Sequence, residues 1–188
     1  KLIGYNTDGY GFMQSVRDAG HDITGKNITV MGVGGASMAI CAQSALDGAA
    51  SVHIFARRTS RYWNRTQKFA ENLSAKTGCQ VCLFDNDDHT ALRDSIAQSY
   101  LLINATSVGM VPDIDDTIIK DTSLFHPELV VADVVYEPQE TRLLREAKAA
   151  GCQTFNGMYM LLHQGAKAFQ IWTGQETVSY THLTLPTT

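Results

Sequence analysis

The chain has 188 residues, of which 44% are hydrophobic, and its 15 lysines and arginines against 19 aspartates and glutamates give a formal net charge of −4. This length and composition suffice for one domain with a buried core. The charge balance excludes a polycationic surface for nucleic acid. No run of about 18 or more apolar residues exists that could cross a membrane. We therefore expect neither nucleic acid nor a membrane as a partner.

The first 24 residues differ in pattern from the rest of the chain. A helix is predicted from Asp8 to Ala19, followed by a loop at 20–25. In Asn6-Thr-Asp-Gly, either Asp8 or Thr7 suits the N-cap of that helix. The chain begins abruptly, without a starting Met or a signal-peptide pattern. We therefore expect a piece of a longer protein.

A glycine-rich turn, Gly32-Val-Gly-Gly-Ala-Ser37, directly follows an apolar segment at 27–31. Glycines permit a tight turn in which backbone N–H groups approach a phosphate, and the positive end of the following helix dipole favours negative charge. The spacing G-x-G-G departs from the usual G-x-G-x-x-G. The turn nevertheless predicts pyrophosphate binding, through Gly32, Gly34, Gly35 and Ala36.

Apolar strands and helical segments alternate from residue 27 onward. Strands are predicted at 27–31, 51–55, 80–84, 100–104, 129–134 and 153–155. Helices are predicted at 37–47, 61–76, 89–97, 140–149 and 158–172. Continuous apolar strands such as Val130-Val-Ala-Asp-Val-Val135 are typical of a parallel sheet covered on both faces. The pattern predicts an α/β fold with a doubly wound, mostly parallel, Rossmann-like sheet that binds ligands at the carboxyl ends of its strands.

Arginines follow the predicted second strand, about twenty residues beyond the glycine turn, where a dinucleotide fold selects its cofactor. An acidic residue there would bind the ribose 2′-hydroxyl, but Phe55-Ala-Arg-Arg-Thr-Ser-Arg61 contains none. Guanidinium groups suit a phosphate through bidentate, charge-assisted hydrogen bonds. Arg57 and Arg58 therefore favour NADP. Solvated arginines at a helix entry are the alternative, and use of NAD stays open.

Four cysteines indicate a reducing compartment, and we expect a cytoplasmic protein. Cys79-Gln-Val-Cys82 has the spacing of a metal or redox motif, but it lies in a strand pattern. Residues three apart in a strand point to opposite faces, so the two sulfur atoms diverge. No second cysteine pair or nearby histidine pair completes a zinc site, and we predict no metal ion.

Five segments together resemble the shikimate dehydrogenase family, closest to its quinate/shikimate branch, over residues 3–175. They are Gly4-Tyr-Asn-Thr-Asp-Gly-Tyr-Gly11, Gly32-Val-Gly-Gly-Ala-Ser37, Asn104-Ala-Thr-Ser-Val-Gly-Met110, Asp133-Val-Val-Tyr-Glu-Pro138 and Gly157-Met-Tyr-Met-Leu-Leu-His-Gln-Gly-Ala166. The resemblance implies reversible hydride transfer between 3-dehydroshikimate and shikimate, or dehydroquinate and quinate, with a nicotinamide cofactor. It also implies an N-terminal substrate domain that this chain lacks, with the active site between the two domains.

The resemblance implies roles for individual residues. Asp8 matches a catalytic Asp that pairs at the reacting hydroxyl with a Lys of the substrate domain, upstream of residue 1. Such a pair can polarise the oxygen and pass a proton. The implied substrate-binding residues are Thr7, Asp8, Tyr136 and Gln164. The implied residues around the nicotinamide are Thr106, Ser107, Val134, Gly157 and Met160.

The same match divides the chain into four parts. Residues 1–24 are a hinge helix segment, 25–156 the dinucleotide-binding domain, and 157–176 a helical segment returning to the substrate cleft. Residues 177–188 carry no charge and no helical stripe, and we expect a tail that is not native to the fold.

Several alternatives remain at this stage. A non-catalytic dinucleotide-binding module would share the fold, and a Rossmann-type methyltransferase is disfavoured because it predicts an acid after the second strand. Shikimate or quinate as substrate, and a monomer or a homodimer, both stay open. His163 lies about 100° around a helix from Gln164 and is expected at a surface or interface. Phe169 and Trp172 are expected to pack the last helix.

Overall fold

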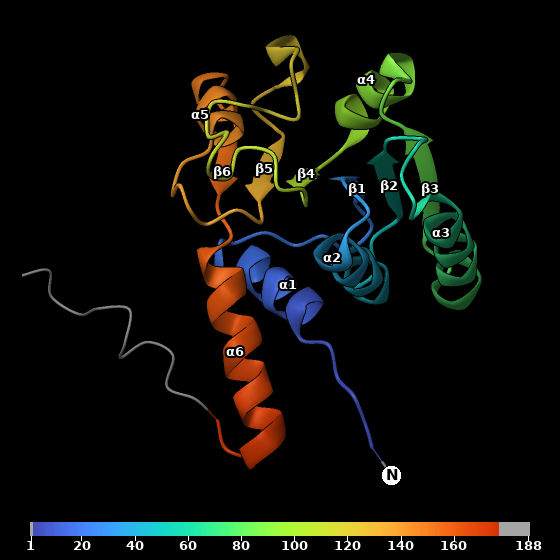
Figure 1. Ribbon diagram of the computed structural model, residues 1–188, viewed down its shortest axis with the longest axis vertical. Helices are drawn as coiled ribbons and strands as arrows, with labels where there is room; N and C mark the ends of the chain where they lie inside the picture. The colour runs from blue at the N-terminus through green and yellow to red at the C-terminus, as the bar shows by residue number, and fades with distance from the viewer. Residues whose placement is uncertain (1, 177–188) are drawn as a thin grey trace, which may run out of the picture.

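Residues 2–176 are described by a computed structural model, in which one six-stranded sheet is covered by helices on both faces (Figure 1). The strands are β1 (Asn27–Met31), β2 (Ser51–Ala56), β3 (Gln80–Asp85), β4 (Leu101–Asn104), β5 (Val130–Asp133) and β6 (Gln153–Phe155). The helices are α1 (Asp8–Asp18), α2 (Gly35–Leu46), α3 (Trp63–Thr77), α4 (His89–Gln98), α5 (Arg142–Ala149) and α6 (Met158–Thr173), with a 3-10 turn η1 at Thr122–Leu124. Each predicted element is present, with ends shifted by at most about two residues.

The sheet has the strand order β3-β2-β1-β4-β5-β6, and every strand pair is parallel. The chain winds outward from β1 to β3 and then returns to place β4 on the other side of β1. The winding direction therefore reverses between β1 and β4, and in such sheets a ligand crevice forms outside the carboxyl ends at that point. The predicted doubly wound α/β fold is confirmed, and the paired strands are entirely parallel.

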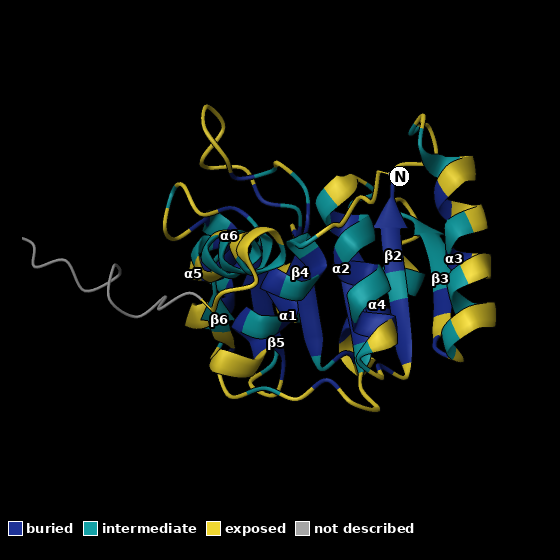
Figure 2. Ribbon diagram, turned by 90° about the horizontal axis from the view of Figure 1, so that it is seen from below, coloured by how far each residue is buried: buried dark blue, intermediate teal, exposed yellow. Residues whose placement is uncertain are grey.

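Two apolar cores lie on opposite faces of the sheet. Along β4, Leu101 and Ile103 belong to one core and Leu102 belongs to the other, as the period of two in a strand requires. The first core packs under α1, α2 and α3, and the second packs under α4 and α5 (Figure 1). The four inner strands β1, β2, β4 and β5 are accordingly buried, the edge strands β3 and β6 are less so, and exposed residues lie on the outer faces of the helices (Figure 2).

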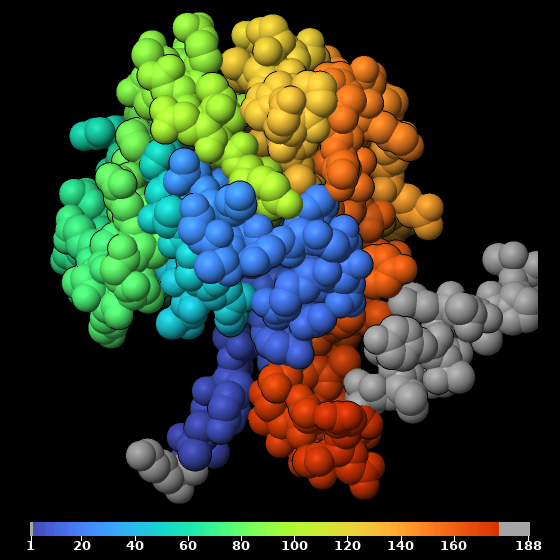
Figure 3. All heavy atoms as spheres, turned by 180° about the vertical axis from the view of Figure 1, so that it is seen from behind, coloured from blue at the N-terminus to red at the C-terminus, as the bar shows by residue number. Residues whose placement is uncertain are grey.

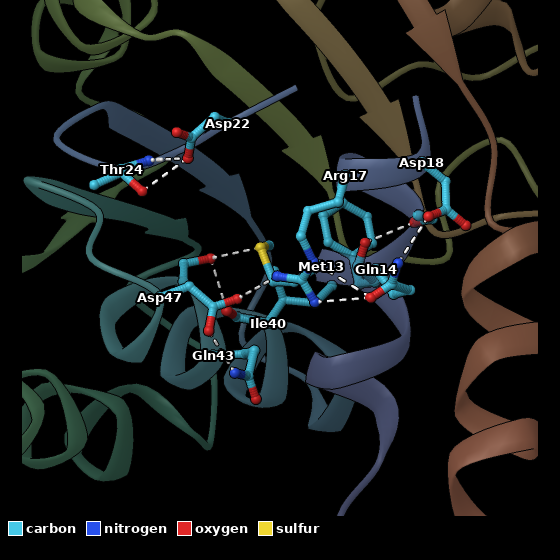
Figure 4. A network of polar contacts seen from close by, with 12 residues as sticks. Met13, Gln14, Arg17, Asp18, Asp22, Thr24, Ile40, Gln43 and Asp47 are labelled. Atoms are coloured by element: carbon cyan, nitrogen blue, oxygen red, sulfur yellow. Dashed lines mark hydrogen bonds and ion pairs between the residues drawn. The ribbon is translucent and has the colours of Figure 1, made fainter. Parts of the chain in front are cut away.

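Helix α1 is held between α2 and α6 by two glycines. A Cβ at Gly9 would overlap the backbone carbonyl of Ala39 in α2, and a Cβ at Gly11 would lie 2.7 Å from the backbone N of Gln164 in α6. Polar contacts support the α1–α2 side, where Arg17 Nη1 lies 3.0 Å from Asp47 Oδ2 (Figure 4). The hinge segment is thus packed directly against the helix that follows the glycine turn.

The N-cap of α1 falls on one of the two predicted residues, without the hydrogen bond that a capping side chain makes. Thr7 occupies the N-cap position, but its side chain makes no capping hydrogen bond. Asp8 is the first helical residue, and its backbone N donates to Asn6 Oδ1 at 2.9 Å. The Asn6 side chain therefore accepts a hydrogen bond from the first helical N–H group, which has no partner within the helix.

Helix α6 projects beyond the sheet on the same side as the residues before α1 (Figures 1 and 3). The expectation that Phe169 and Trp172 pack this helix is wrong, because they are 42% and 81% exposed. The helix extends past the sheet that would otherwise cover its last turns. His163 is largely buried instead, with Nε2 at 2.8 Å from Asp18 Oδ2 of α1.

The remaining sequence predictions concern thiols, metals and membranes. Cys41, Cys79, Cys82 and Cys152 are free, and Cys79 belongs to the first core. Within residues 2–176, no group of three or more His, Cys, Asp or Glu side chains could hold a metal ion. No helix in this part of the chain is long and apolar enough to cross a membrane. The predicted tail at 177–188 lies outside the described residues.

Candidate functional site

A cavity of about 1320 Å³ lies at the carboxyl end of the sheet. Four segments form most of its wall: 32–36 after β1, 55–57 and 59–62 at the end of β2 and in the loop that follows, 105–108 and 110–111 after β4, and 134–137 after β5. The loops after β1 and β4 flank the point where the winding direction reverses. The cavity therefore occupies the position at which open α/β sheets bind ligands.

The glycine turn forms the middle of this wall. Gly32 has φ +111°, and a Cβ there would lie 2.8 Å from the carbonyl oxygen of Ala105 in the neighbouring loop. Gly34 and Gly35 have no such neighbour within 4 Å and face open space. Helix α2 begins at Gly35, so its first-turn N–H groups lie at the cavity without intrahelical partners. This turn can hold an anion.

The loop after β2 brings two arginines and a tyrosine to the cavity. Arg57, Arg61 and Tyr62 line it, and the Arg61 guanidinium lies 4.7 Å from the centroid of the Tyr62 ring. Arg58 is absent from the wall, and its guanidinium lies 5.1 Å from the Trp63 ring centroid. Helix α3 begins at Trp63, which leaves Arg61 in the loop. The cationic end of the cavity is thus formed by Arg57 and Arg61.

Asn86 adds a polar group to the same wall. It follows β3, and its backbone N donates to the carbonyl of Ala56 at 2.9 Å, which continues the pairing with β2. Its side-chain Oδ1 is buried and has no hydrogen-bond partner among the described residues. Asn86 therefore adds a polar residue to the part of the wall that Arg57 and Arg61 form.

The loops after β4 and β5 are joined beneath the cavity by two buried side chains. Asn104 and Asp133 are paired across the sheet, and Asn104 Nδ2 donates to Asp133 Oδ1 at 3.0 Å. Burial raises the pKa of the Asp133 carboxyl, and hydrogen bonds from Val135, Thr141 and Asn104 offset part of that rise. The carboxylate is therefore held by neutral donors.

Comparisons with known proteins agree with this geometry. The family model for the shikimate 5′-dehydrogenase C-terminal domain matches residues 157–177. A shikimate dehydrogenase (NADP(+)) from Listeria innocua is 50% identical, and a quinate/shikimate dehydrogenase from Escherichia coli O139:H28 is 41% identical; each match covers 93% of this chain and 60% of the relative. A crystal structure of shikimate 5-dehydrogenase from Listeria monocytogenes, in complex with shikimate and NAD, superposes with a TM-score of 0.91 at 48% identity, covering 94% of this chain and 61% of that one.

By the family model, by sequence and by fold, the chain is similar to the C-terminal part of shikimate dehydrogenases. It spans 60% of the length of the curated relatives that it matches. Its six-stranded parallel sheet corresponds to the Rossmann-like part of these shikimate dehydrogenases.

The predicted site residues of this shikimate dehydrogenase homologue divide into two groups. Most of the predicted cofactor residues lie on the cavity wall, together with Tyr136: Gly32, Gly34, Gly35, Ala36, Arg57, Thr106, Ser107, Val134. The remaining predicted residues lie off that wall: Thr7, Asp8, Arg58, Gly157, Met160, Gln164. Met160 is 9% exposed and packs in the first core.

The second group still lies close to the first through backbone packing. A Cβ at Gly157 would overlap the carbonyl of Val134, so α6 begins directly against the cavity loop. Gly11 places α1 against Gln164 of α6. Gln164 Nε2 donates to the carbonyl of Leu161 at 3.0 Å within its own helix. Asp8 and Gln164 therefore belong to one α1–α6 unit beside the cavity.

Sequence reasoning missed Arg61 and Asn86. Arg61 belongs to the same arginine-rich run as Arg57. The sequence predicted a helix from residue 61, but α3 begins at Trp63, so Arg61 lies in the loop that lines the cavity. Asn86 carries no motif, since a single asparagine after a strand is common in loops. The signal that could have indicated it is its place directly after the third parallel strand, at the carboxyl edge of the sheet.

Proposed function

We propose that this chain is the dinucleotide-binding part of an NADP-linked shikimate or quinate dehydrogenase. The single observation that supports the proposal most strongly is the cavity itself. It combines an anion-binding glycine turn with Arg57 and Arg61, at a strand end that carries no acidic residue. A dinucleotide with a phosphorylated ribose matches both features, because its pyrophosphate suits the glycine turn and its ribose phosphate suits the arginines.

The residues present fit such a cofactor. Gly34 and Gly35 leave open space where backbone N–H groups would approach the pyrophosphate. Arg57 and Arg61 would hold the 2′-phosphate. Asn86 lines the same cavity and carries an amide group of the kind that hydrogen-bonds to an adenine ring. The cofactor, when bound, supplies the hydride acceptor, and the protein supplies orientation and exclusion of water.

Asp8 and Gln164 would serve the substrate. Oxidation of a secondary alcohol moves a hydride from carbon to the cofactor and releases the hydroxyl proton, so a proton acceptor must lie within hydrogen-bond reach. Asp8 at the start of α1 is half-buried and would take part in that transfer. Tyr136, exposed at the cavity rim, and Gln164 would bind hydroxyl or carboxylate groups of the substrate.

Helix α6 offers a surface for the substrate domain. Four of its apolar side chains are more than 40% exposed: Tyr159, Leu161, Phe169, Trp172. A concentration of exposed apolar groups on one projecting helix marks a contact surface. We propose that the substrate domain of the longer protein packs there, next to Asp8.

Titration of the chain with NADP and NAD side by side tests the cofactor assignment. We expect saturable binding of NADP that is tighter than that of NAD, with little oxidation of shikimate by the chain alone. Absence of binding by both dinucleotides would overturn the proposal. A longer protein that binds NADP but turns over neither shikimate nor quinate would instead support a non-catalytic dinucleotide-binding module.

A further inference from the structure

Two buried polar residues lie beneath the cavity without lining it. Asn104 is the last residue of β4 and Asp133 is the last residue of β5, and they face each other in the register of the two strands. Their exposed fractions are 1% and 0%. Neither contacts the cavity, so neither serves as a binding residue.

Asn104 determines the path of the loop after β4. Its Oδ1 accepts hydrogen bonds from Thr106 N at 3.1 Å and Thr106 Oγ1 at 2.6 Å, and its Nδ2 donates to the Val108 carbonyl at 3.1 Å. Thr106, Ser107 and Val108 all line the cavity. These backbone groups have left the sheet and lost their ladder partners, and the Asn104 amide replaces them.

Asp133 does the same for the loop after β5. Its Oδ1 accepts from Val135 N at 2.9 Å as well as from Asn104, and its Oδ2 accepts from Thr141 Oγ1 at 2.8 Å. Thr141 is the N-cap of α5. Within residues 2–176, Asp133 forms no ion pair, so its charge is balanced by directed hydrogen bonds alone.

We propose that Asn104 and Asp133 are positioning residues that fix the spacing of the two loops around the nicotinamide half of the bound dinucleotide. This inference rests on the proposed function. An apolar pair would join β4 and β5 equally well, but it would leave Val135 N and Thr106 N without acceptors. The polar pair therefore sets the position of the loops, and the loops set the shape of one half of the cavity. The arginine end of the cavity is formed by the loop after β2, to which neither Asn104 nor Asp133 donates or accepts a hydrogen bond.

The test separates the two halves of the ligand. In the 188-residue chain, Asp133→Ala removes the acceptor for Val135 N and Thr141 Oγ1 and the partner of the Asn104 amide, so the two loops lose their link, and we expect NADP affinity to fall about tenfold or more. Adenosine 2′,5′-bisphosphate contacts only the other half, so its affinity is expected to change less than about threefold. Asp133→Asn keeps Oδ1 as an acceptor, and its Nδ2 can donate to Thr141, so it should restore NADP binding.

A matched control removes a buried hydrogen bond elsewhere. Thr29 Oγ1 and Ser99 Oγ are 2.7 Å apart, both buried, and neither lines the cavity. Thr29→Val should leave the ratio of NADP to bisphosphate affinity unchanged. Where Asp133→Ala does not fold, Asn104→Ala gives the same comparison.

The outcomes are distinct. An equal loss of NADP and bisphosphate affinity in Asp133→Ala, or no rescue by Asp133→Asn, overturns the positioning role. Failure of the unmodified chain to bind NADP overturns the proposed function instead.

Discussion

Gly11 and Gln164 hold α1 and α6 in backbone contact. A Cβ at residue 11 would stand 2.7 Å from the backbone N of Gln164 and 2.7 Å from the carbonyl oxygen of Met160. Neither atom can move without displacing α6. This contact sets how Asp8, three residues before Gly11, is placed relative to Gln164, and these are the two residues to which we assign substrate roles.

Gly11→Ala is therefore expected to be destabilising. The added methyl group meets backbone atoms, and overpacking of this kind costs about 1–3 kcal/mol. Gly165→Ala on α6 is a matched control, because no atom lies within 4 Å of its Cβ position. There the gain in helix propensity is expected to stabilise the fold by up to about 1 kcal/mol. Urea unfolding of both variants measures the difference, and a Gly11→Ala variant as stable as the parent contradicts the close contact.

Gly32→Ala is expected to abolish tight dinucleotide binding. Residue 32 has φ +111°, and its Cβ would crowd Ala105 and Thr106, which displaces the turn. We expect NADP affinity to fall at least about tenfold. Gly25→Ala controls for backbone strain, since φ is +69° there with open space around it. Calorimetric titration should show that Gly25→Ala binds NADP with the affinity of the parent chain. An equal loss of NADP affinity in Gly25→Ala and Gly32→Ala would show that the loss comes from reduced stability of the fold.

Arg61→Ala is expected to reduce the preference for NADP over NAD. A guanidinium bound to the 2′-phosphate contributes about 1.5–3 kcal/mol through charge-assisted hydrogen bonds. NADP affinity should therefore fall about tenfold or more, while NAD affinity changes little. Arg58→Ala is the matched control, because Arg58 lies against Trp63 and not on the cavity wall. A larger loss of NADP binding in Arg58→Ala would return the phosphate role to that residue.

Asp8→Asn tests the catalytic proposal in a longer protein that includes the substrate domain. The substitution keeps the size of the side chain and removes its basicity, so shikimate oxidation should fall about 100-fold or more, within the range for loss of a general base. NADP affinity should stay unchanged, because Asp8 lies off the cavity wall. Steady-state rates and NADP titration measure the two effects. Loss of NADP affinity would show that Asp8 supports the fold of the site.

The free energy of unfolding is expected to fall in mild acid. Burial lowers the pKa of His53 and of His21 below the ordinary value for a histidine. A folded-state pKa below the unfolded value gives stability that is present above the unfolded pKa and is lost as the pH falls through the folded one. His53 Nδ1 lies 2.8 Å from Ser95 Oγ, and a glutamine can keep such a contact without titrating. His53→Gln should weaken the dependence of the urea midpoint on pH between 7.5 and 5; an unchanged dependence contradicts the prediction.

The sequence by itself determined the sheet, the glycine turn and the order of the elements. Continuous apolar strands such as Leu101–Asn104 and glycines after Met31 are local signals, because backbone propensity and hydrophobic pattern act over a few residues. The turn also predicted an anion-binding loop, because glycines directly after a strand permit the positive φ that Gly32 adopts.

Only the tertiary structure decided which side chains reach the ligand. Arg58 and Arg61 lie in the same arginine-rich run, and nothing local to the run distinguishes them. In the structure Arg58 stacks on Trp63, whereas Arg61 lines the cavity. Trp172 looks like a core residue and is 81% exposed. Asn104 and Asp133 are 29 residues apart and form one pair only because β4 and β5 are neighbours in register. Such choices depend on contacts between distant segments, which local propensity does not encode.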